Sequence, residues 1–285
     1  MTSDSLFRQA WRRFRRHRLG IPSVVVFVII VVVSFGASIF APTDPNYIDV
    51  SVISQPPSAE HPLGTDKLGR DIWSRLLNGG QVSLTVALVA VSISLAIGTI
   101  FGLISGYYGG RVDFSMQRFL EIVAALPTLI IIISVVAVFG ANIFNTMLII
   151  GILGWVDLAR FVRGQALQTR AQDFVLAART IGSTNRHIMV QHILPNVLPY
   201  VLIWITFAFT GAILTETALS YLGLGVQLPT PSWGNLVGAA GNMGDLQRHP
   251  WMWLPAGLLI TITVLTLNFI GDALRDALDP QTQIE

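Results

Sequence analysis

The stretch VSLTVALVAVSISLAIGTIFGLI, residues 82–104, contains no charged side chain. An α-helix rises about 1.5 Å per residue, so roughly 20 apolar residues cross the ~30 Å hydrocarbon core of a bilayer. The stretch is therefore predicted to be a membrane-spanning helix, and the rest of the chain is interpreted outward from it.

The composition agrees with a membrane protein. Of the 285 residues 52% are hydrophobic and only 12% are charged, and the mean hydropathy is +0.63. Soluble domains have about a quarter of their residues charged. Because only helices and closed barrels satisfy their backbone within lipid, these long apolar runs predict an all-α membrane protein. Cysteine is absent, which excludes disulfides, a thiol nucleophile and thiolate metal sites.

Six membrane-spanning helices are predicted in total. Besides 82–104, the other five apolar runs are 21–40, 119–139, 143–159, 195–219 and 251–270. Six arginines precede the first run and no small-residue cleavage site follows it, which favours a retained span over a removed signal peptide.

The basic residues predict the orientation. With a cytoplasmic N-terminus, 14 of the 18 Lys and Arg residues lie inside and 4 outside, so both termini are predicted to be cytoplasmic. No internal repeat is apparent, and one membrane domain is expected. Its predicted parts are a basic tail (1–20), a first span (21–40), an extracytoplasmic loop (41–81), a membrane core (82–275) with a cytoplasmic loop at 164–194, and a C-terminal tail (276–285).

Small residues recur every four positions on the second span and beyond it: Ala90, Ser94, Gly98, Gly102 and Gly106. Such a stripe lets helix backbones approach closely in lipid. Packing within one chain is the favoured interpretation, and a seam between subunits is the alternative. In the loop before this span, residues 70–77 are predicted to form a short amphipathic helix that ends at Gly79-Gly80.

Several catalytic motifs are missing. The single lysine, Lys67, is not part of a Gly-Lys-Ser/Thr phosphate loop, no HExxH pair occurs, and no Gly-x-Ser-x-Gly elbow occurs. A membrane hydrolase or metalloprotease is therefore disfavoured, and no catalytic residue or metal ligand is assigned.

The polar stretch FVLAARTIGSTNRHIMVQHILP, residues 174–195, lies in the predicted cytoplasmic loop. Residues 172–181 and 184–193 are predicted to form two short helices around Gly182, which suits a left-handed cap, and Pro195 can start the next span. The side chains of the alanine pair at 177 and 178 are small, so a partner protein can approach this side of the helix closely. A helix lying on anionic lipid is the alternative.

Here the sequence resembles a known family. The pattern formed by Ala177-Ala178, Gly182 and Leu194-Pro195 is similar to the "EAA" loop of the permease subunits of ABC importers, although Leu176 replaces the leading glutamate. Six further stretches are similar to the C-type permease of dipeptide and oligopeptide importers: HPLGTDKLGRDIWSRLL (61–77), GYYGGRVD (106–113), ALP (125–127), ARFVRG (159–164), LSYLGLGVQLPTPSWG (219–234) and GDALRDALDP (271–280).

The resemblance implies a type I ABC importer fold in the bacterial cytoplasmic membrane. It implies four partners besides lipid, namely a homologous second permease, two ATPase subunits that bind ATP and Mg²⁺, and an extracytoplasmic solute-binding protein. No cofactor or nucleic acid is expected on this chain, which is not an enzyme. It also implies that the loop is a coupling helix that docks on an ATPase through Leu176, Ala177, Ala178, Arg179, Gly182 and Arg186.

The solute stays open, because nickel and glutathione importers have the same kind of subunit. Two rival classes are an ion-gradient-driven secondary transporter and a membrane-embedded enzyme or scaffold. The first would need midplane acids, which the centres of spans one, two and six lack.

Charged and proline residues within the spans have two interpretations each. Glu216 either faces the translocation path or an outer gate, or accepts hydrogen bonds from Thr215, Thr217 or a loop. Pro127, Pro199 and Pro255 are expected to kink or unwind spans, as gating hinges or as plain bends. Glu121 with Arg118, and Asp157 with Arg160, are interpreted as i, i+3 pairs.

The outer motif from residue 64 to 71 also has two interpretations. Its glycines permit tight turns and its charged side chains can bridge one another, so a structural brace is favoured over a contact with the binding protein. The motif residues are Gly64, Asp66, Gly69, Arg70 and Asp71.

Overall fold

The computed structural model describes residues 11–15, 17–239 and 243–278. These residues form helices and loops, and apart from one isolated β-bridge between Thr65 and Asp71 they contain no strand, so the all-α prediction is confirmed. Residues 1–10 and 16 of the predicted N-terminal tail and 279–285 of the predicted C-terminal tail lie outside the described residues.

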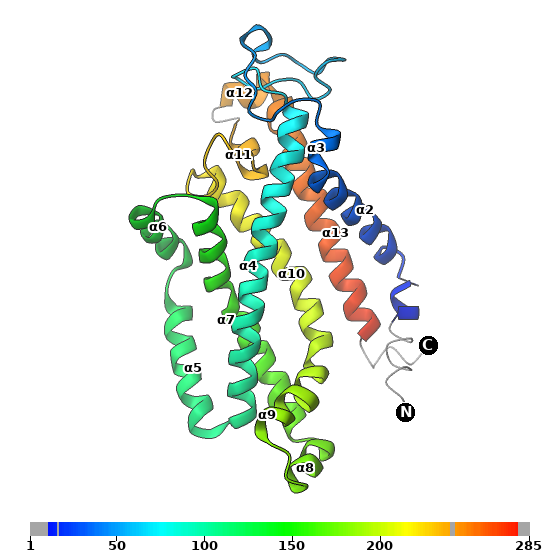
Figure 1. The fold of residues 1–285 in the computed structure, drawn as a ribbon, viewed down its shortest axis with the longest axis vertical. Coiled ribbons are helices and arrows are strands. Elements are labelled where there is room, and N and C mark those ends of the chain that lie inside the picture. The colour runs from blue at the N-terminus through cyan, green and yellow to red at the C-terminus, as the bar shows by residue number, and fades with distance from the viewer. Residues whose placement is uncertain (1–10, 16, 240–242, 279–285) are drawn as a thin grey trace.

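The longer helices are α2 (Gly20–Phe35), α4 (Ile72–Tyr108), α5 (Gly110–Ala125), α6 (Thr128–Phe139), α7 (Ile143–Arg170), α10 (Leu194–Tyr221) and α13 (Leu254–Leu278). Most of them run roughly along one axis of the molecule, and α6 is turned away from it (Figure 1). The short helices are α3 (Ala37–Phe40), α8 (Asp173–Thr180), α9 (Asn185–His187), α11 (Trp233–Gly238) and α12 (Met243–Arg248).

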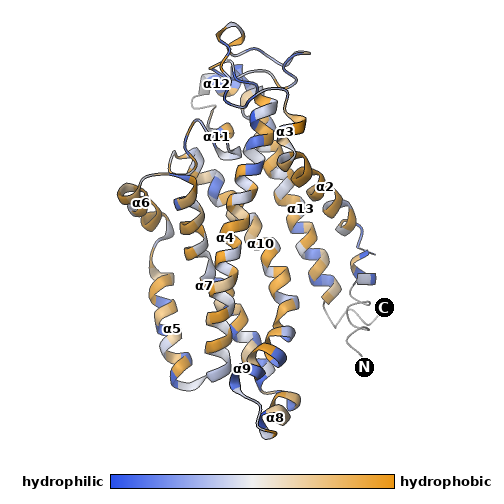
Figure 2. Cartoon of the chain, viewed as in Figure 1, coloured by the Kyte–Doolittle hydropathy of each residue, from blue (hydrophilic) through white to orange (hydrophobic). Residues whose placement is uncertain are grey.

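Four described helices are long and apolar enough to cross a membrane, and the bent pair α5–α6 would make a fifth. The four are α4, α7, the continuous helix Asn185–Tyr221 and α13. The predicted first span appears as α2, whose 16 residues are fewer than a full crossing needs, followed by the short α3. Figure 2 shows that hydrophobic residues are concentrated along the long helices.

The small-residue stripe packs α4 against α7 of the same chain. A Cβ added at Gly102 would lie 2.6 Å from the carbonyl oxygen of Ala159, and one at Gly106 would lie 2.7 Å from the Cβ of Ala166. Ser94 also donates a hydrogen bond of 2.8 Å to the carbonyl of Gly151. The prediction of packing within one chain is confirmed, because no larger side chain fits in this interface.

The helix α4 does not end at Gly79-Gly80, so that prediction is wrong. It begins after Asp71, whose carboxylate caps the Ser74 N–H at 2.7 Å, and it continues through both glycines. A Cβ at Gly79 would meet the backbone of Ser232 at 3.1 Å. The glycines therefore permit a close approach of the 223–232 loop rather than a turn.

The predicted third span is broken. Leu126 is extended (φ −80°, ψ 126°), as expected for a residue before proline, and α5 and α6 meet at 75° around Leu126-Pro127. The predicted kink at Pro127 is confirmed.

The helix predicted at 184–193 and the span predicted to start at Pro195 are continuous in the structure. A π-helical turn, Ile188–Ile193, joins α9 to α10, and Leu194 N–H bonds to the carbonyl of Met189, five residues earlier. Pro195 lies in the first turn of α10, where its missing N–H costs little.

Two further helix boundaries differ from the predictions. The prediction of a kink at Pro255 is wrong, because this proline lies in the first turn of α13. The helix α7 continues to Arg170, so part of the predicted loop 164–194 is helical.

Candidate functional site

Residues 172–187, called the protrusion below, extend beyond the long helices at one end of the molecule (Figure 1). The first turn of α2 and the last turn of α13 are the ends of these two helices that lie nearer the protrusion. Two helical segments form the protrusion, α8 and α9, with a tight turn between them.

One face of α8 is buried against the bundle. Val175 is fully buried and Ala178 is 6% exposed, in one cluster with Ile188 and Ile193. Both alanines were predicted to form a partner surface. For Ala178 this prediction is wrong, because its side chain is buried in the core of the chain itself. Ala177 is exposed.

The other face of the protrusion presents apolar side chains to its surroundings. Phe174 is 42% exposed, Leu176 is 47% exposed and Ile181 is 83% exposed. Arg179 and Arg186, which were also predicted to take part in coupling, are exposed as well. An apolar patch with basic neighbours at the end of a long bundle is suited to docking in a groove of a partner protein.

Gly182 ends α8 as predicted. Its φ of +85° is in the left-handed region, the N–H of Ser183 bonds to the Ala178 carbonyl at 3.1 Å, and the Gly182 N–H bonds to the Arg179 carbonyl at 3.1 Å. These bonds satisfy the last carbonyls of α8 and set the direction in which the chain enters α9.

A cluster around Tyr107 holds the protrusion to the bundle. The Tyr107 hydroxyl donates to Asn185 Oδ1 at 2.7 Å, and the Arg179 guanidinium lies 5.5 Å from the centre of the Tyr107 ring. Arg170, at the end of α7, donates to the Tyr107 carbonyl at 2.8 Å. These contacts connect the protrusion to α4 and α7. Sequence reasoning did not assign these roles, although Tyr107 lies in the quoted stretch GYYGGRVD.

An ion pair next to this cluster was also missed. The Arg163 guanidinium binds both carboxylate oxygens of Asp113, at 2.5 and 2.6 Å, and Ser105 donates to the same carboxylate at 2.5 Å. The contact joins the start of α5 to α7. Nothing in the spacing of residues 113 and 163 indicated it, because the pair forms only once the helices pack.

At the opposite end of the molecule the predicted outer motif forms a compact cluster. The Asp66 carboxylate accepts from the Arg70 backbone N–H at 3.0 Å and from Arg70 Nε at 2.7 Å. Gly64 and Gly69 have φ values of +75° and +74°. Asp71 caps α4 and lies 2.9 Å from His61 Nδ1. These hydrogen bonds within the loop fit the predicted structural brace. A contact with a binding protein stays a prediction.

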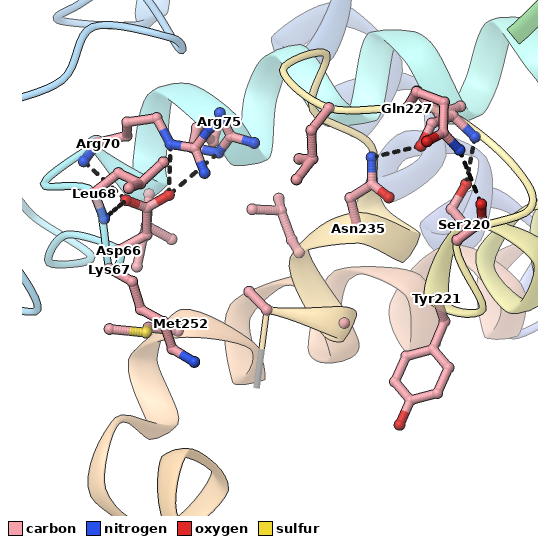
Figure 3. Close-up of a pocket in the computed structure, with 17 residues that line it drawn as sticks. Asp66, Lys67, Leu68, Arg70, Arg75, Ser220, Tyr221, Gln227, Asn235 and Met252 are labelled. Carbon is pink, nitrogen blue, oxygen red and sulfur yellow. Dashed lines mark hydrogen bonds and ion pairs between the residues drawn. The ribbon is translucent and has the colours of Figure 1, made fainter. Parts of the chain in front are cut away.

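The cluster borders an outer pocket of about 400 Å³ (Figure 3). Asp66, Arg70 and Arg75 lie on one side of it, and Asn235 and Gln227 lie across from them. Arg75 is only 2% exposed and its Nε is 3.8 Å from Asp66. The charged side chains on this side of the pocket are thus paired within the chain.

A second ion pair fastens this loop to α12. Lys67 Nζ lies 2.5 Å from Asp245 Oδ2. The hydrogen bond from Lys67 is the main reason that the pKa of Asp245 is lowered from its ordinary value. The pair links two loops that are 178 residues apart in sequence.

Glu216 lies within the outer half of α10 and is completely buried. Its carboxylate accepts hydrogen bonds from Ser83 at 2.8 Å and from Ser220 at 2.7 Å. The Ser83 hydroxyl accepts in turn from the Trp233 N–H, and the Ser220 hydroxyl accepts from the Val226 N–H, both at 3.1 Å. Glu216 therefore holds the two serines that fix the loop after α10.

Of the donors expected from sequence, the loop after α10 does serve Glu216, through the hydroxyl of Ser232. Thr215 donates to the carbonyl of Gly211 instead. A role for Glu216 in a gate stays a prediction, as do hinge roles for Pro127 and for Pro199, which lies inside the continuous α10.

Two family models match the chain. The first, described as the inner membrane component of binding-protein-dependent transport systems, matches residues 98–284. The second, described as the N-terminal transmembrane domain of oligopeptide transport permease C, matches residues 5–57.

Curated relatives are similar over nearly the whole chain. The oligopeptide transport system permease protein of Bacillus subtilis is 39% identical over 98% of this chain and 91% of its own length. The corresponding protein of Haemophilus influenzae is 41% identical over 97% and 89%. A glutathione transport system permease protein of Escherichia coli is 39% identical over 96% and 90%.

Among solved structures, an inward-facing MetNI methionine ABC transporter contains a chain of similar fold. The TM-score is 0.56, with 16% identity over 71% of this chain and 96% of that chain. This likeness concerns the fold alone, and it agrees with the importer fold that the sequence implied.

Proposed function

The chain belongs to the family of inner-membrane components of binding-protein-dependent transport systems, and from this membership we propose that it forms part of an ATP-driven importer of short peptides. The support for the solute class is that the similar permeases are named for oligopeptides, dipeptides and glutathione, itself a tripeptide. Nickel has no such support among these relatives.

We propose that the importer has the composition that the family suggests. A second permease of similar fold would pair with this chain, two ATPase subunits would bind ATP and Mg²⁺, and an extracytoplasmic binding protein would deliver the peptide. In this arrangement α2 and the bent pair α5–α6 complete six crossings. The protrusion and both termini would then lie in the cytoplasm.

The observation that carries the mechanism is the anchored apolar protrusion. Its exposed side chains Phe174, Leu176 and Ile181 would dock on an ATPase, while Tyr107 and Asn185 tie it to the bundle. ATP binding would then move the protrusion and, through its anchors, the inner ends of α4, α7 and α10. Packed helices respond to such a shift by changing between discrete arrangements, which would alternate access to the peptide path.

The remaining predicted residues have accessory roles in this proposal. The broken segment around Pro127 and the interior Pro199 would act as hinges for the movement. The hydrogen bonds of Glu216 to Ser83 and Ser220 would make the outer end of the bundle move as one unit when it opens and closes. The outer motif from residue 64 to 71 would brace the surface on which the binding protein lands.

The test is uptake by the assembled importer in proteoliposomes. The chain would be produced with its second permease and ATPases and supplied with binding protein and a labelled short peptide. Uptake should require ATP hydrolysis and should continue when ion gradients are collapsed. Uptake driven by a proton gradient without ATP would contradict the proposal, and so would purification of the chain without a stoichiometric ATPase.

A further inference from the structure

Asp157 is a charged residue at an unexpected depth. The neighbouring helix α4 has no charged side chain after Arg75, and the next charged residue is Arg111 in α5, so the middle of this uncharged segment is near residue 93. Asp157 lies level with Gly98, because a Cβ added at Gly98 would lie 2.9 Å from both the Trp155 carbonyl oxygen and the Leu158 Cβ. At 1.5 Å per residue this is about 8 Å from the middle, well within a half-thickness of ~15 Å.

The carboxylate of Asp157 is open to its surroundings at this depth. Its side chain is 86% exposed, and among the described residues its ion-pair partner is Arg160, at 3.8 Å and itself 49% exposed. Arg160 is one turn nearer the end with the protrusion and can extend toward the interface, whereas the short side chain of Asp157 cannot. A carboxylate facing lipid at this depth would be very costly, so Asp157 must face water or a polar partner.

The surface around Asp157 is a groove rather than a flat face. A groove of about 430 Å³ lies between α4, α6, α7 and α10. Its lining includes Asp157, the hydroxyl-bearing Thr128 and Thr215, and the aromatic Trp204 and Phe207. This volume falls in the range of sites for small ligands, which combine apolar walls with a few polar groups.

We propose that this groove is one wall of the peptide path and that the Asp157 carboxylate binds the ammonium group of the passing peptide. The inference rests on the proposed function and names a residue for it. The charges are complementary, and the small, hydroxyl and aromatic side chains around the carboxylate accept varied peptide side chains. Arg160 offers a cation one turn further along for the peptide's carboxylate or carbonyl groups.

Accessibility is the first test. Because the natural chain has no cysteine, Asp157→Cys places the single thiol of this chain in the groove, and labelling is read on this chain after it is separated from its partners. A charged, membrane-impermeant methanethiosulfonate reagent should label it without detergent. The control is Ile29→Cys on α2, which is 54% exposed in the middle of that helix on the opposite flank from α6 and should stay unlabelled (Figure 1). An unlabelled Asp157→Cys would overturn the proposal.

Transport by charge variants is the second test. Asp157→Asn, which keeps the shape, should lower peptide uptake at limiting peptide about tenfold, the effect of losing one charge-assisted contact. ATP hydrolysis stimulated by the binding protein should persist, and Asp157→Glu should retain uptake. The matched control is Asp276→Asn, which changes a carboxylate that is 65% exposed and 3.6 Å from His17, and which should transport normally.

The remaining outcomes separate this inference from its premise. Equal uptake by Asp157→Asn and the wild type would refute the role of the carboxylate. Loss of the second permease from purified Asp157→Asn would assign the residue to subunit assembly instead, which also refutes it. A wild-type importer without ATP-driven uptake would contradict the proposed function, while the thiol labelling would still report whether the groove contains water.

Discussion

Two neighbouring alanines on α8 should respond in opposite ways to the same substitution. Ala177 is exposed, so Ala177→Trp should leave the chain folded and abolish coupling to the ATPase. Ala178 is 6% exposed within the core that includes Val175 and Ile188, so Ala178→Trp should prevent normal folding. The pair separates a docking surface from a packing surface within one turn of helix.

The magnitudes follow from burial. Docking would bury the exposed parts of Phe174, Leu176 and Ile181. Complete burial of one such side chain contributes about 1.5–3 kcal/mol, so burial of these exposed parts would contribute roughly 3–5 kcal/mol to the free energy of docking. An indole at residue 177 would hold these side chains away from the partner and lower ATPase affinity at least about a hundredfold. At residue 178 it would overpack a filled core, at a cost of about 3 kcal/mol or more.

The assay combines purification and transport. Ala177→Trp should be made in normal amounts and melt at the wild-type temperature. It should lose the co-purifying ATPase and ATP-dependent uptake. Ala178→Trp should be depleted from the membrane. Normal uptake by Ala177→Trp would show that the protrusion is not the docking surface, and a stable, active Ala178→Trp would show that its assigned packing is wrong.

Three further predictions concern the turn, the buried carboxylate and the outer ion pair. Gly182→Val should lower uptake and destabilise the protrusion by about 1–3 kcal/mol, because the backbone at this position has a positive φ. Gly182→Asn should be tolerated, and equal uptake by the two variants would contradict this prediction. Glu216→Ala should lower the stability of the folded chain by about 2–4 kcal/mol, since the buried hydroxyls of Ser83 and Ser220 lose their acceptor. Glu216→Gln should lower it by about 1 kcal/mol, and thermal unfolding in detergent measures both effects. The lowered pKa of Asp245 means that its pair with Lys67 stabilises the outer loops at neutral pH and loses this effect as the pH falls below about 4. The difference in melting temperature between the wild type and Asp245→Asn should therefore shrink on acidification, and a constant difference would argue against the pair.

Much of the fold could be predicted because its signals are local. An apolar run predicts a span wherever it occurs, and the small-residue stripe on α4 predicted a close helix contact. Gly182 and Pro127 act through their own backbone preferences, so the turn after α8 and the break before α6 followed from residue type alone.

The errors arose where a local preference met a tertiary partner. Gly79-Gly80 has the composition of a helix end, but the 223–232 loop packs against it, and the helix continues. The helices predicted at 184–193 and from Pro195 onward were treated as separate segments, but the π-helical turn before Pro195 joins them. The pair of Asp157 and Arg160 was predicted from its i, i+3 spacing and is confirmed at 3.8 Å, whereas the position of Asp157 level with Gly98 follows only from the packing of α7 against α4.

The sequence by itself determined the helical class, the apolar runs, the family and the position of the segment proposed to dock on the ATPase subunits, since each depends on residues adjacent along the chain. The tertiary structure alone decided which alanine of the protrusion faces outward, that Tyr107 and Asn185 anchor it, and that Ser83 and Ser220 satisfy Glu216. These contacts join residues from different helices, and the rotation of each helix about its axis is set by packing against its neighbours, which no local pattern specifies.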